Sequence, residues 1–182
     1  MEKPLTKKAA LPESVYAETA YVHSLQSMGL VDGPGVRFVV FLQGCPLRCE
    51  YCHNPDTHDF AGGKTYTVKE LVKRFKRYRV YFGEFGGVTF SGGEPLCQGE
   101  FLWAAIQACQ AEDIHTAVDT SGFTFDAFGE QVLNEVDLLL LDFKYTKEQD
   151  YKRRVGCSIS VPLHALELRE KANKPVWLRQ VI

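Results

Sequence analysis

Three cysteines lie within eight residues of this chain and are its clearest candidates for chemistry. Cys45, Cys49 and Cys52 stand in the segment Cys-Pro-Leu-Arg-Cys-Glu-Tyr-Cys-His. Thiolates this close together can bind one soft metal centre, either an iron–sulfur cluster or a zinc ion. Three ligands on a four-iron cluster leave one iron open to another ligand, and an open iron can take part in a reaction.

Zinc is the plainer interpretation of these cysteines, and it requires a fourth ligand. His53 directly follows Cys52 and His58 lies nearby, but adjacent ligands suit a tetrahedral site poorly, and no second ligand pair follows. An iron–sulfur cluster needs only the three cysteines if a cofactor supplies the ligands of the fourth iron.

Three further polar motifs follow predicted strands. They are Gly92-Gly93-Glu94-Pro95, Asp119-Thr120-Ser121-Gly122 and Asp142-Phe143-Lys144. Taken singly, each also fits a plainer structure, such as a tight turn, an Asx turn or a surface ion pair. Glycines at a strand end allow a ligand to approach the backbone closely, and Glu94 could hold an amino group. Because the carboxyl ends of parallel strands lie at one edge, the motifs together with the cysteines predict one site.

The strands that must position these motifs are short and apolar. We predict strands at 36–42, 88–90, 116–119, 136–143 and 176–182, all rich in Val, Leu and Phe. Nearly unbroken apolar runs are typical of parallel strands that are buried on both faces. The cysteine motif begins directly after the first of these strands, where a structural zinc site has no reason to lie.

Amphipathic helices are predicted between the strands. Thr67-Val68-Lys69-Glu70 has the spacing of a capping box and opens a helix over 67–79. Apolar stripes indicate further helices over 101–109 and, more weakly, 126–135. Strands that alternate with helices predict right-handed crossovers and a parallel sheet.

A fourth helix is predicted after residue 159. Ser160 is expected to cap it, with Pro162 in the first turn and with Leu163, Leu166 and Ala172 facing inward.

The composition excludes several classes of function. The chain has 182 residues, enough for one domain, and its net charge of -2 gives no case for a nucleic-acid partner or a membrane surface. No apolar run approaches the length of a membrane span. We therefore expect a cytoplasmic protein, in which thiols stay reduced and the six cysteines do not form a disulfide scaffold. Cys109 is expected to be a buried, inert thiol.

The two ends of the sequence differ from its middle. Residues 1–20, which contain Pro4 and Pro12, are expected to form a loose N-terminal leader, and the domain to cover 21–182. The sequence ends on the apolar strand 176–182 with no turn or polar tail after it. We therefore expect a C-terminally truncated chain that lacks at least one further β/α unit.

The combination of motifs resembles one enzyme superfamily. The cysteine spacing with Tyr51 before the last cysteine, followed by Gly-Gly-Glu-Pro, resembles the radical S-adenosylmethionine (SAM) enzymes. Asp32-Gly33-Pro34-Gly35, Tyr51-Cys52-His53-Asn54 and Asp119-Thr120-Ser121-Gly122-Phe123 resemble more narrowly the activases of glycyl radical enzymes. The 38 residues between Cys52 and Ser91 contain no cysteine, which favours the short type that activates pyruvate formate-lyase.

This resemblance implies the fold, the reaction and the cofactors. The expected fold is α/β, a partial (β/α)6-type barrel of parallel strands whose last units are missing. A 4Fe–4S cluster on Cys45, Cys49 and Cys52 would bind SAM and cleave it reductively, and a hydrogen atom would leave a backbone glycine of the partner, which becomes a glycyl radical. No general base is required, so no catalytic side chain is expected.

The resemblance also implies which residues bind. Tyr51 and His53 would flank the adenine and the cluster, and Gly92, Gly93 and Glu94 would receive the methionine amino group of SAM. A monovalent cation near the cofactor carboxylate would be held by Asp119, Thr120 and Asp142. The full set of expected cofactor-binding residues is Tyr51, Cys52, His53, Gly92, Gly93, Glu94, Asp142, Phe143, Lys144, Tyr145, Thr146 and Arg179.

The implied partners are a glycyl radical enzyme as the protein substrate and a flavodoxin or ferredoxin-type electron donor, with the activase itself a monomer. The basic helix over 67–79 could dock an acidic donor, although a solvated outer helix face explains its charges better. Three alternatives remain: an activase of another glycyl radical enzyme such as anaerobic ribonucleotide reductase, a small-molecule radical SAM enzyme such as a deazapurine-forming synthase, and a non-enzymatic, zinc-stabilised binding domain.

Overall fold

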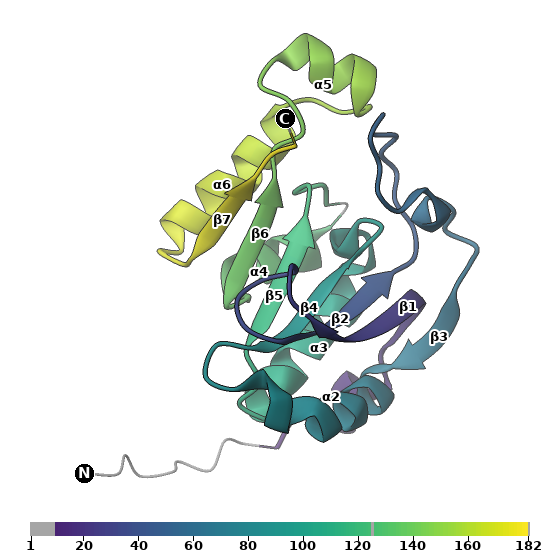
Figure 1. The fold of residues 1–182 in the computed structure, drawn as a ribbon, viewed down its shortest axis with the longest axis vertical. Coiled ribbons are helices and arrows are strands. Elements are labelled where there is room, and N and C mark those ends of the chain that lie inside the picture. The colour runs from purple at the N-terminus through teal and green to yellow at the C-terminus, as the bar shows by residue number, and fades with distance from the viewer. Residues whose placement is uncertain (1–9, 125, 182) are drawn as a thin grey trace.

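A computed structural model describes residues 10–124 and 126–181 of the chain (Figure 1). In this described part the centre is a seven-stranded sheet with the order β3-β1-β2-β4-β5-β6-β7. The strands are β1 (Thr19–Gly29), β2 (Arg37–Leu42), β3 (Lys64–Thr67), β4 (Gly87–Gly92), β5 (Thr116–Thr120), β6 (Leu138–Asp142) and β7 (Val176–Arg179). From β2 to β7 all neighbours are parallel, whereas β1 pairs antiparallel with both β2 and β3. The sheet has two edge strands, β3 and β7, and so does not close into a barrel.

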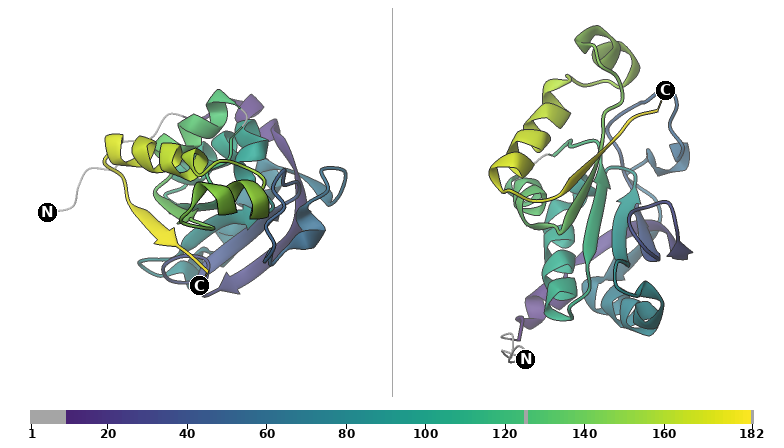
Figure 2. Two further views of the ribbon diagram at one scale, coloured as in Figure 1. Left: turned by 90° about the horizontal axis from the view of Figure 1, so that it is seen from above. Right: turned by 60° about the vertical axis from the view of Figure 1, so that its left-hand side comes forward.

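The described helices are α1 (Glu13–Ala17), α2 (Val68–Phe82), α3 (Gly99–Ala111), α4 (Ala127–Glu135), α5 (Glu148–Arg154) and α6 (Ser160–Lys171). All of them except α5 form a layer that covers one face of the sheet (Figure 1 and Figure 2). One core joins apolar residues of α2, α3, α4 and α6 to the strand residues that face them, such as Val40, Phe90, Val118 and Leu139. The views in Figure 2 show α5 apart from this layer, beyond the carboxyl end of β6. None of the described helices is long and apolar enough to cross a membrane.

The five predicted strands are confirmed, and β6 and β7 are shorter than predicted. The antiparallel strands β1 and β3 were not predicted. In β1 the exposed residue Tyr21 lies between the buried residues Ala20 and Val22, and the second half of the strand is mostly exposed. A strand with one solvated face shows no continuous apolar run, so the sequence pattern did not reveal it.

The N-terminal region begins its structure earlier than expected. Within the expected leader, α1 forms over Glu13–Ala17 and β1 starts at Thr19. Val15 and Tyr16 pack against the main core, and Glu13 forms an ion pair with Lys69. Residues 13–20 of the expected leader thus form a helix and the start of a strand, and residues 1–9 lie outside the described part of the chain.

The helix predictions are confirmed at α2, α3 and α4. The capping box at α2 is present, because Thr67 Oγ1 accepts from Glu70 N at 3.1 Å and Glu70 Oε2 accepts from Thr67 N at 2.8 Å. Cys109 is fully buried, as expected.

The prediction for α6 is wrong in two respects. Ser160 is the first helical residue and its side chain forms no cap, and Leu163 is 44% exposed. The buried positions are Pro162, Ala165 and Arg169, which lie three and four residues apart on one face. Leu163 belongs to the opposite face, so it points to solvent.

Two arginines are fully buried near the amino ends of the parallel strands. Arg37, the first residue of β2, donates to Thr89 Oγ1 at 2.9 Å and to the Val88 carbonyl oxygen at 2.5 Å. Arg169 donates to backbone carbonyl oxygens of Leu133, Val136 and Pro175. These hydrogen bonds tie β2 to β4 and tie α6 to the segments that precede β6 and β7.

Candidate active site

The carboxyl ends of β4, β5, β6 and β7 and the segments that follow β2, β4 and β5 meet around a cavity of about 140 Å³. Its position at the carboxyl ends of the strands agrees with the sequence prediction of one site. The lining residues are Cys45, Leu47, Cys52, His53, Asn54, Ser91, Gly92, Gly93, Glu94, Asp119, Thr120, Ser121, Asp142 and Arg179.

The structure brings most of the predicted site residues to this cavity. Those that do not line it are Cys49, Tyr51, Phe143, Lys144, Tyr145 and Thr146. Cys49 and Tyr145 pack instead on a small cluster around Leu47 and Tyr151, and Phe143 packs on the main core. Thr146 is exposed.

Tyr51 connects the cysteine loop to the turn after β6. Its hydroxyl donates to the Lys144 carbonyl oxygen at 2.6 Å, and its ring centroid lies 5.6 Å from that of Tyr145. Burial raises the pKa of Tyr51 to about 12, so the hydroxyl stays a donor at neutral pH. The tyrosine therefore supports the position of the loop from behind.

The three cysteines of the loop are half-buried. Burial, followed by the Glu94 charge, raises the pKa of Cys45 to about 12, and burial also raises the pKa of Cys49. A positive metal centre offsets both effects, so the donor set fits a cluster. In the described part of the chain, no three His, Cys, Asp or Glu side chains are already arranged as a metal-binding group.

The glycine turn after β4 packs directly against the start of the cysteine loop. Gly93 N donates to the Leu42 carbonyl oxygen at 2.8 Å, and Glu94 N donates to the Gly44 carbonyl oxygen at 2.9 Å. Gly92 has a φ of 106°, and a β-carbon there would overlap Leu42 N. A β-carbon on Gly93 would likewise overlap the Gly44 carbonyl oxygen. Only glycines allow these two backbones to approach so closely.

The Glu94 carboxylate is buried and fully engaged by the protein. It accepts from Thr120 Oγ1 and Ser121 Oγ, each at 2.5 Å, from Ser121 N at 2.9 Å and from Leu96 N at 3.2 Å. Burial raises its pKa, while the hydrogen bonds from Ser121 and Thr120 oppose that change. The carboxylate thus joins the turn after β4 to the turn after β5.

Two further carboxylates are held by two cationic side chains. Arg179 of β7 donates to Asp119 Oδ1 at 2.5 Å and to Asp142 Oδ1 at 3.2 Å. Lys144 Nζ lies 2.5 Å from Asp142 Oδ2, and Ser91 Oγ donates to Asp119 Oδ2 at 2.9 Å. The pKa of Asp119 is raised, because the effect of burial is larger than the opposing effect of the nearby Arg179 charge. These groups link the ends of β4, β5, β6 and β7.

The predicted ligands of the monovalent cation already have partners within the protein. Arg179 and Lys144 supply one positive charge for each of the two carboxylates, and the Thr120 hydroxyl donates to Glu94. The cation on Asp119, Thr120 and Asp142 stays a prediction.

Sequence reasoning missed four lining residues, Leu47, Asn54, Ser91 and Ser121. Ser91 could have been found from its place directly before Gly92, near the carboxyl end of β4. Asn54 and Ser121 adjoin predicted residues in the turns. Leu47 carried no polar signal.

Known proteins resemble this chain over most of its length. Residues 31–160 match the family model of a 4Fe-4S single cluster domain. The chain is 49% identical over 162 residues to a pyruvate formate-lyase-activating enzyme of Clostridium pasteurianum. This match covers 88% of this chain and 68% of that protein. The chain is 43% identical over 164 residues to the pyruvate formate-lyase 1-activating enzyme of Escherichia coli (strain K12), with 88% and 67% covered. This chain thus spans about two thirds of the length of both relatives.

A solved structure supports the fold. Streptococcus suis SuiB bound to precursor peptide SuiA superposes with a TM-score of 0.64 over 77% of this chain and 31% of that chain, at 14% sequence identity. Together with the family model and the relatives, the partial barrel and its cysteine loop show that the chain belongs to the pyruvate formate-lyase-activating enzymes of the radical SAM superfamily, whose cofactors are a 4Fe–4S cluster and SAM.

Proposed function

We propose that this protein activates pyruvate formate-lyase: it cleaves SAM reductively and removes a hydrogen atom from a backbone glycine of that enzyme, which becomes a glycyl radical. The observation that carries the proposal is the meeting of the cysteine loop and three polar turns around one cavity. The 49% identity to a protein named for this activity supports it.

Cys45, Cys49 and Cys52 are the residues that would hold the 4Fe–4S cluster through their sulfur atoms. Cys45 and Cys52 line the cavity, and both Cys45 and Cys49 pack against the cluster of Leu47, which also lines the cavity. When bound, the cluster and SAM supply the one-electron chemistry that no side chain here provides. The protein contributes position, charge balance and shelter from water.

The polar turns are proposed to receive SAM. Gly92 and Gly93 offer backbone groups beside the cysteine loop, and Glu94 holds the turn that presents them. Asp119, Thr120 and Asp142 keep their proposed role around a monovalent cation. In this structure Arg179 donates to both aspartates. In the SAM complex its guanidinium would reach the carboxylate of the cofactor and form a charge-assisted hydrogen bond with it.

The remaining expected residues have supporting roles in the proposal. His53 borders the cavity and would contact the adenine. We propose that the other expected residues stabilise the turn after β6, on which or against which they lie. They are Tyr51, Phe143, Lys144, Tyr145 and Thr146. We also propose that residues 21–182 form the radical SAM domain. The electron donor is proposed to be a flavodoxin or a ferredoxin-type protein, and the activase itself is proposed to be a monomer in the cytoplasm.

The proposal is tested by anaerobic reconstitution with iron and sulfide, followed by metal analysis. The protein is then incubated with a reductant, SAM and pyruvate formate-lyase, and the glycyl radical is measured by electron paramagnetic resonance. Cys49→Ser is expected to lose the cluster and the radical signal, whereas the matched control Cys157→Ser keeps both. If the protein binds zinc and neither iron nor sulfide, the proposed enzyme activity is wrong and a zinc-stabilised binding domain is favoured.

The choice of protein substrate is tested separately. The same assay with anaerobic ribonucleotide reductase in place of pyruvate formate-lyase is expected to give no glycyl radical. If the protein cleaves SAM and forms a radical only on the ribonucleotide reductase, it is the activase of that reductase and not of pyruvate formate-lyase. If it cleaves SAM but acts on neither protein, a small-molecule substrate is indicated.

A further inference from the structure

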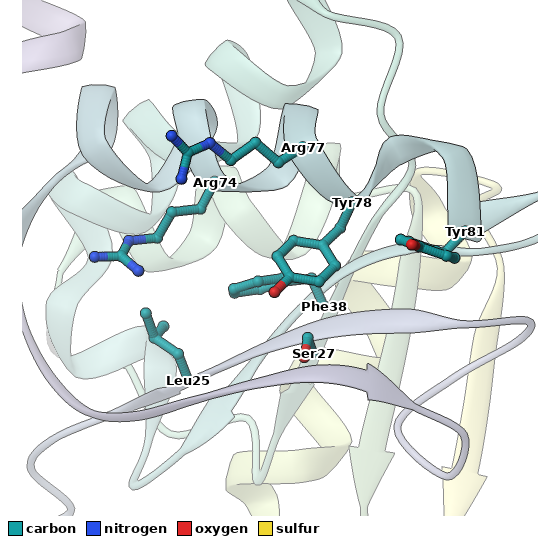
Figure 3. Close-up of a pocket in the computed structure, with 7 residues that line it drawn as sticks. All are labelled: Leu25, Ser27, Phe38, Arg74, Arg77, Tyr78 and Tyr81. Carbon is teal, nitrogen blue, oxygen red and sulfur yellow. The ribbon is translucent and has the colours of Figure 1, made fainter.

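A second cavity, of about 450 Å³, lies between β1 and the C-terminal half of α2 (Figure 3). Its lining residues are Leu25, Ser27, Phe38, Arg74, Arg77, Tyr78 and Tyr81. Phe38 is the second residue of β2, whereas the cysteine loop follows Leu42 at the other end of that strand. This cavity, which we call the β1–α2 pocket, is therefore separate from the candidate active site.

Two guanidinium groups flank the β1–α2 pocket, and none of its lining residues is acidic. Arg74 and Arg77 are three residues apart on α2, and both are exposed. Neither guanidinium lies within ion-pair distance of a described carboxylate, and the Arg74 charge acts on Glu70 only at longer range. Arg74 lies over the ring of Tyr66, 5.3 Å from its centroid. Two other cations of the same helix are paired, Lys69 with Glu13 and Lys76 with Glu112.

Aromatic rings form the wall of the pocket beside these arginines. The Phe38 and Tyr78 centroids are 5.2 Å apart, and those of Tyr78 and Tyr81 are 6.2 Å apart. Phe38 is buried, but Tyr81 is 51% exposed, so an aromatic face remains open to solvent. Figure 3 shows Leu25 on the opposite side, pointing from β1 toward α2. The pocket thus combines an apolar, partly aromatic surface with two positive charges.

We propose that the β1–α2 pocket binds a phosphate monoester attached to a planar ring, which is the chemistry of a mononucleotide. A phosphate monoester carries close to two negative charges, which matches two unpaired guanidinium groups, whereas a carboxylate carries one. Tyr78 and Tyr81 offer ring faces and hydroxyl donors to the base. The volume lies within the range of small-molecule sites in proteins, roughly 300–1,000 Å³.

The test measures binding of guanosine 5′-monophosphate to the reconstituted protein by isothermal titration calorimetry. Saturating SAM is present, so that the candidate active site is occupied and contributes no signal. Arg74→Gln and Arg77→Gln are each expected to weaken binding at least ~10-fold, since each removes a charge-assisted contact to phosphate. Tyr81→Ala, at an exposed position, is expected to weaken binding ~5-fold by loss of ring contact.

Lys73→Gln is the matched control, because Lys73 is exposed on the same helix but does not line the pocket. It is expected to change the affinity less than ~2-fold, as for a surface charge at a distance. Guanosine alone and inorganic phosphate alone are expected to bind at least ~10-fold more weakly than the nucleotide, because each offers one half of the ligand.

Three results would overturn the proposal. One is the absence of binding at millimolar nucleotide. The second is an equal loss of affinity in Lys73→Gln and Arg77→Gln, which indicates a diffuse basic surface. The third is binding of inorganic phosphate or of a poly-glutamate peptide as tight as that of the nucleotide, which indicates an anion surface that does not recognise a ring. Thermal unfolding of each variant is measured in parallel, and the exposed arginine positions are expected to leave it unchanged.

Discussion

Charged side chains are buried or half-buried at both ends of the parallel strands, but the two ends satisfy them differently. At the amino end, Arg37 and Arg169 donate mostly to backbone carbonyl oxygens of neighbouring segments. At the carboxyl end, Asp119 and Asp142 are held by ion pairs with the side chains of Arg179 and Lys144.

This difference separates structural charges from charges that can do chemistry. A buried guanidinium whose hydrogen bonds go to backbone carbonyl oxygens of neighbouring segments holds those segments together, and Arg169 keeps only its Nε without a partner among the described residues. Carboxylates and cations that face a cavity can be rearranged by an entering anion. We therefore expect substitutions at the amino end to change stability and substitutions at the carboxyl end to change activity.

The largest expected effect is at the carboxyl end. Cys52→Ser should reduce activation of pyruvate formate-lyase at least ~100-fold, because even residues that only support metal ligands affect activity by 10–100-fold. The unfolding midpoint in urea of the protein without its cluster should stay unchanged, since Cys52 is only partly buried. A large loss of stability in this variant would break the proposed separation between the two ends.

At the amino end, Arg37→Met should lower the free energy of unfolding by roughly 3 kcal/mol, because the Val88 carbonyl and Thr89 hydroxyl oxygens lose a buried donor. Methionine keeps the apolar part of the side chain. Urea unfolding measures the change, and iron content per folded protein should remain normal. A variant of native stability that binds no cluster would reverse the assignment.

Glu94→Gln sharpens the comparison, because this carboxylate is at the carboxyl end yet is buried and satisfied by the protein itself. The amide nitrogen of Gln cannot accept the bonds from Thr120 and Ser121, so we expect a loss of about 1–2 kcal/mol in stability. SAM affinity should fall by about 10-fold through displacement of the turn. Equilibrium dialysis with labelled SAM measures the affinity. Glu94→Ala should be worse in both respects, and equal behaviour of the two variants would argue against the hydrogen-bonded role.

The smallest expected effect concerns pH. Burial, and then the nearby Arg37 charge, lowers the pKa of His115 from 6.5, with Asp137 opposing. The neutral ring is therefore favoured in the folded state, and its contribution to stability is present above pH 6.5 and is lost as the pH falls below it. Unfolding curves between about pH 7 and about pH 5 should be less pH-dependent in His115→Gln than in the native protein. A steeper dependence in the variant would contradict the assigned direction.

The sequence predicted those parts of the molecule whose signals are local. The apolar runs of β2, β4, β5, β6 and β7 and the polar turns after them were enough to predict one site at the carboxyl ends. The capping box of α2 was predicted for the same reason, because all of its hydrogen bonds lie within four residues.

Features that depend on tertiary contacts could not be predicted. Arg37 and Arg169 carry no local sign of burial, since their hydrogen-bond partners are distant in the sequence. The helix α5 has no apolar stripe and buries only Tyr151. Tyr145 does not line the cavity, and its ring packs toward Tyr151, 6.5 Å between centroids, a contact between side chains that no local pattern indicates.

The contact between Gly92–Gly93 and the backbone of Leu42 and Gly44 has a consequence for how the metal centre is assembled. Since two backbones fix the beginning of the cysteine loop, that part of the loop is ordered by the sheet and not by the metal. Iron and sulfide then enter a polypeptide that has already folded, unlike a zinc finger, which folds only on binding its metal. Loss of the cluster to oxygen or to a chelator should accordingly leave a folded scaffold that can be rebuilt repeatedly.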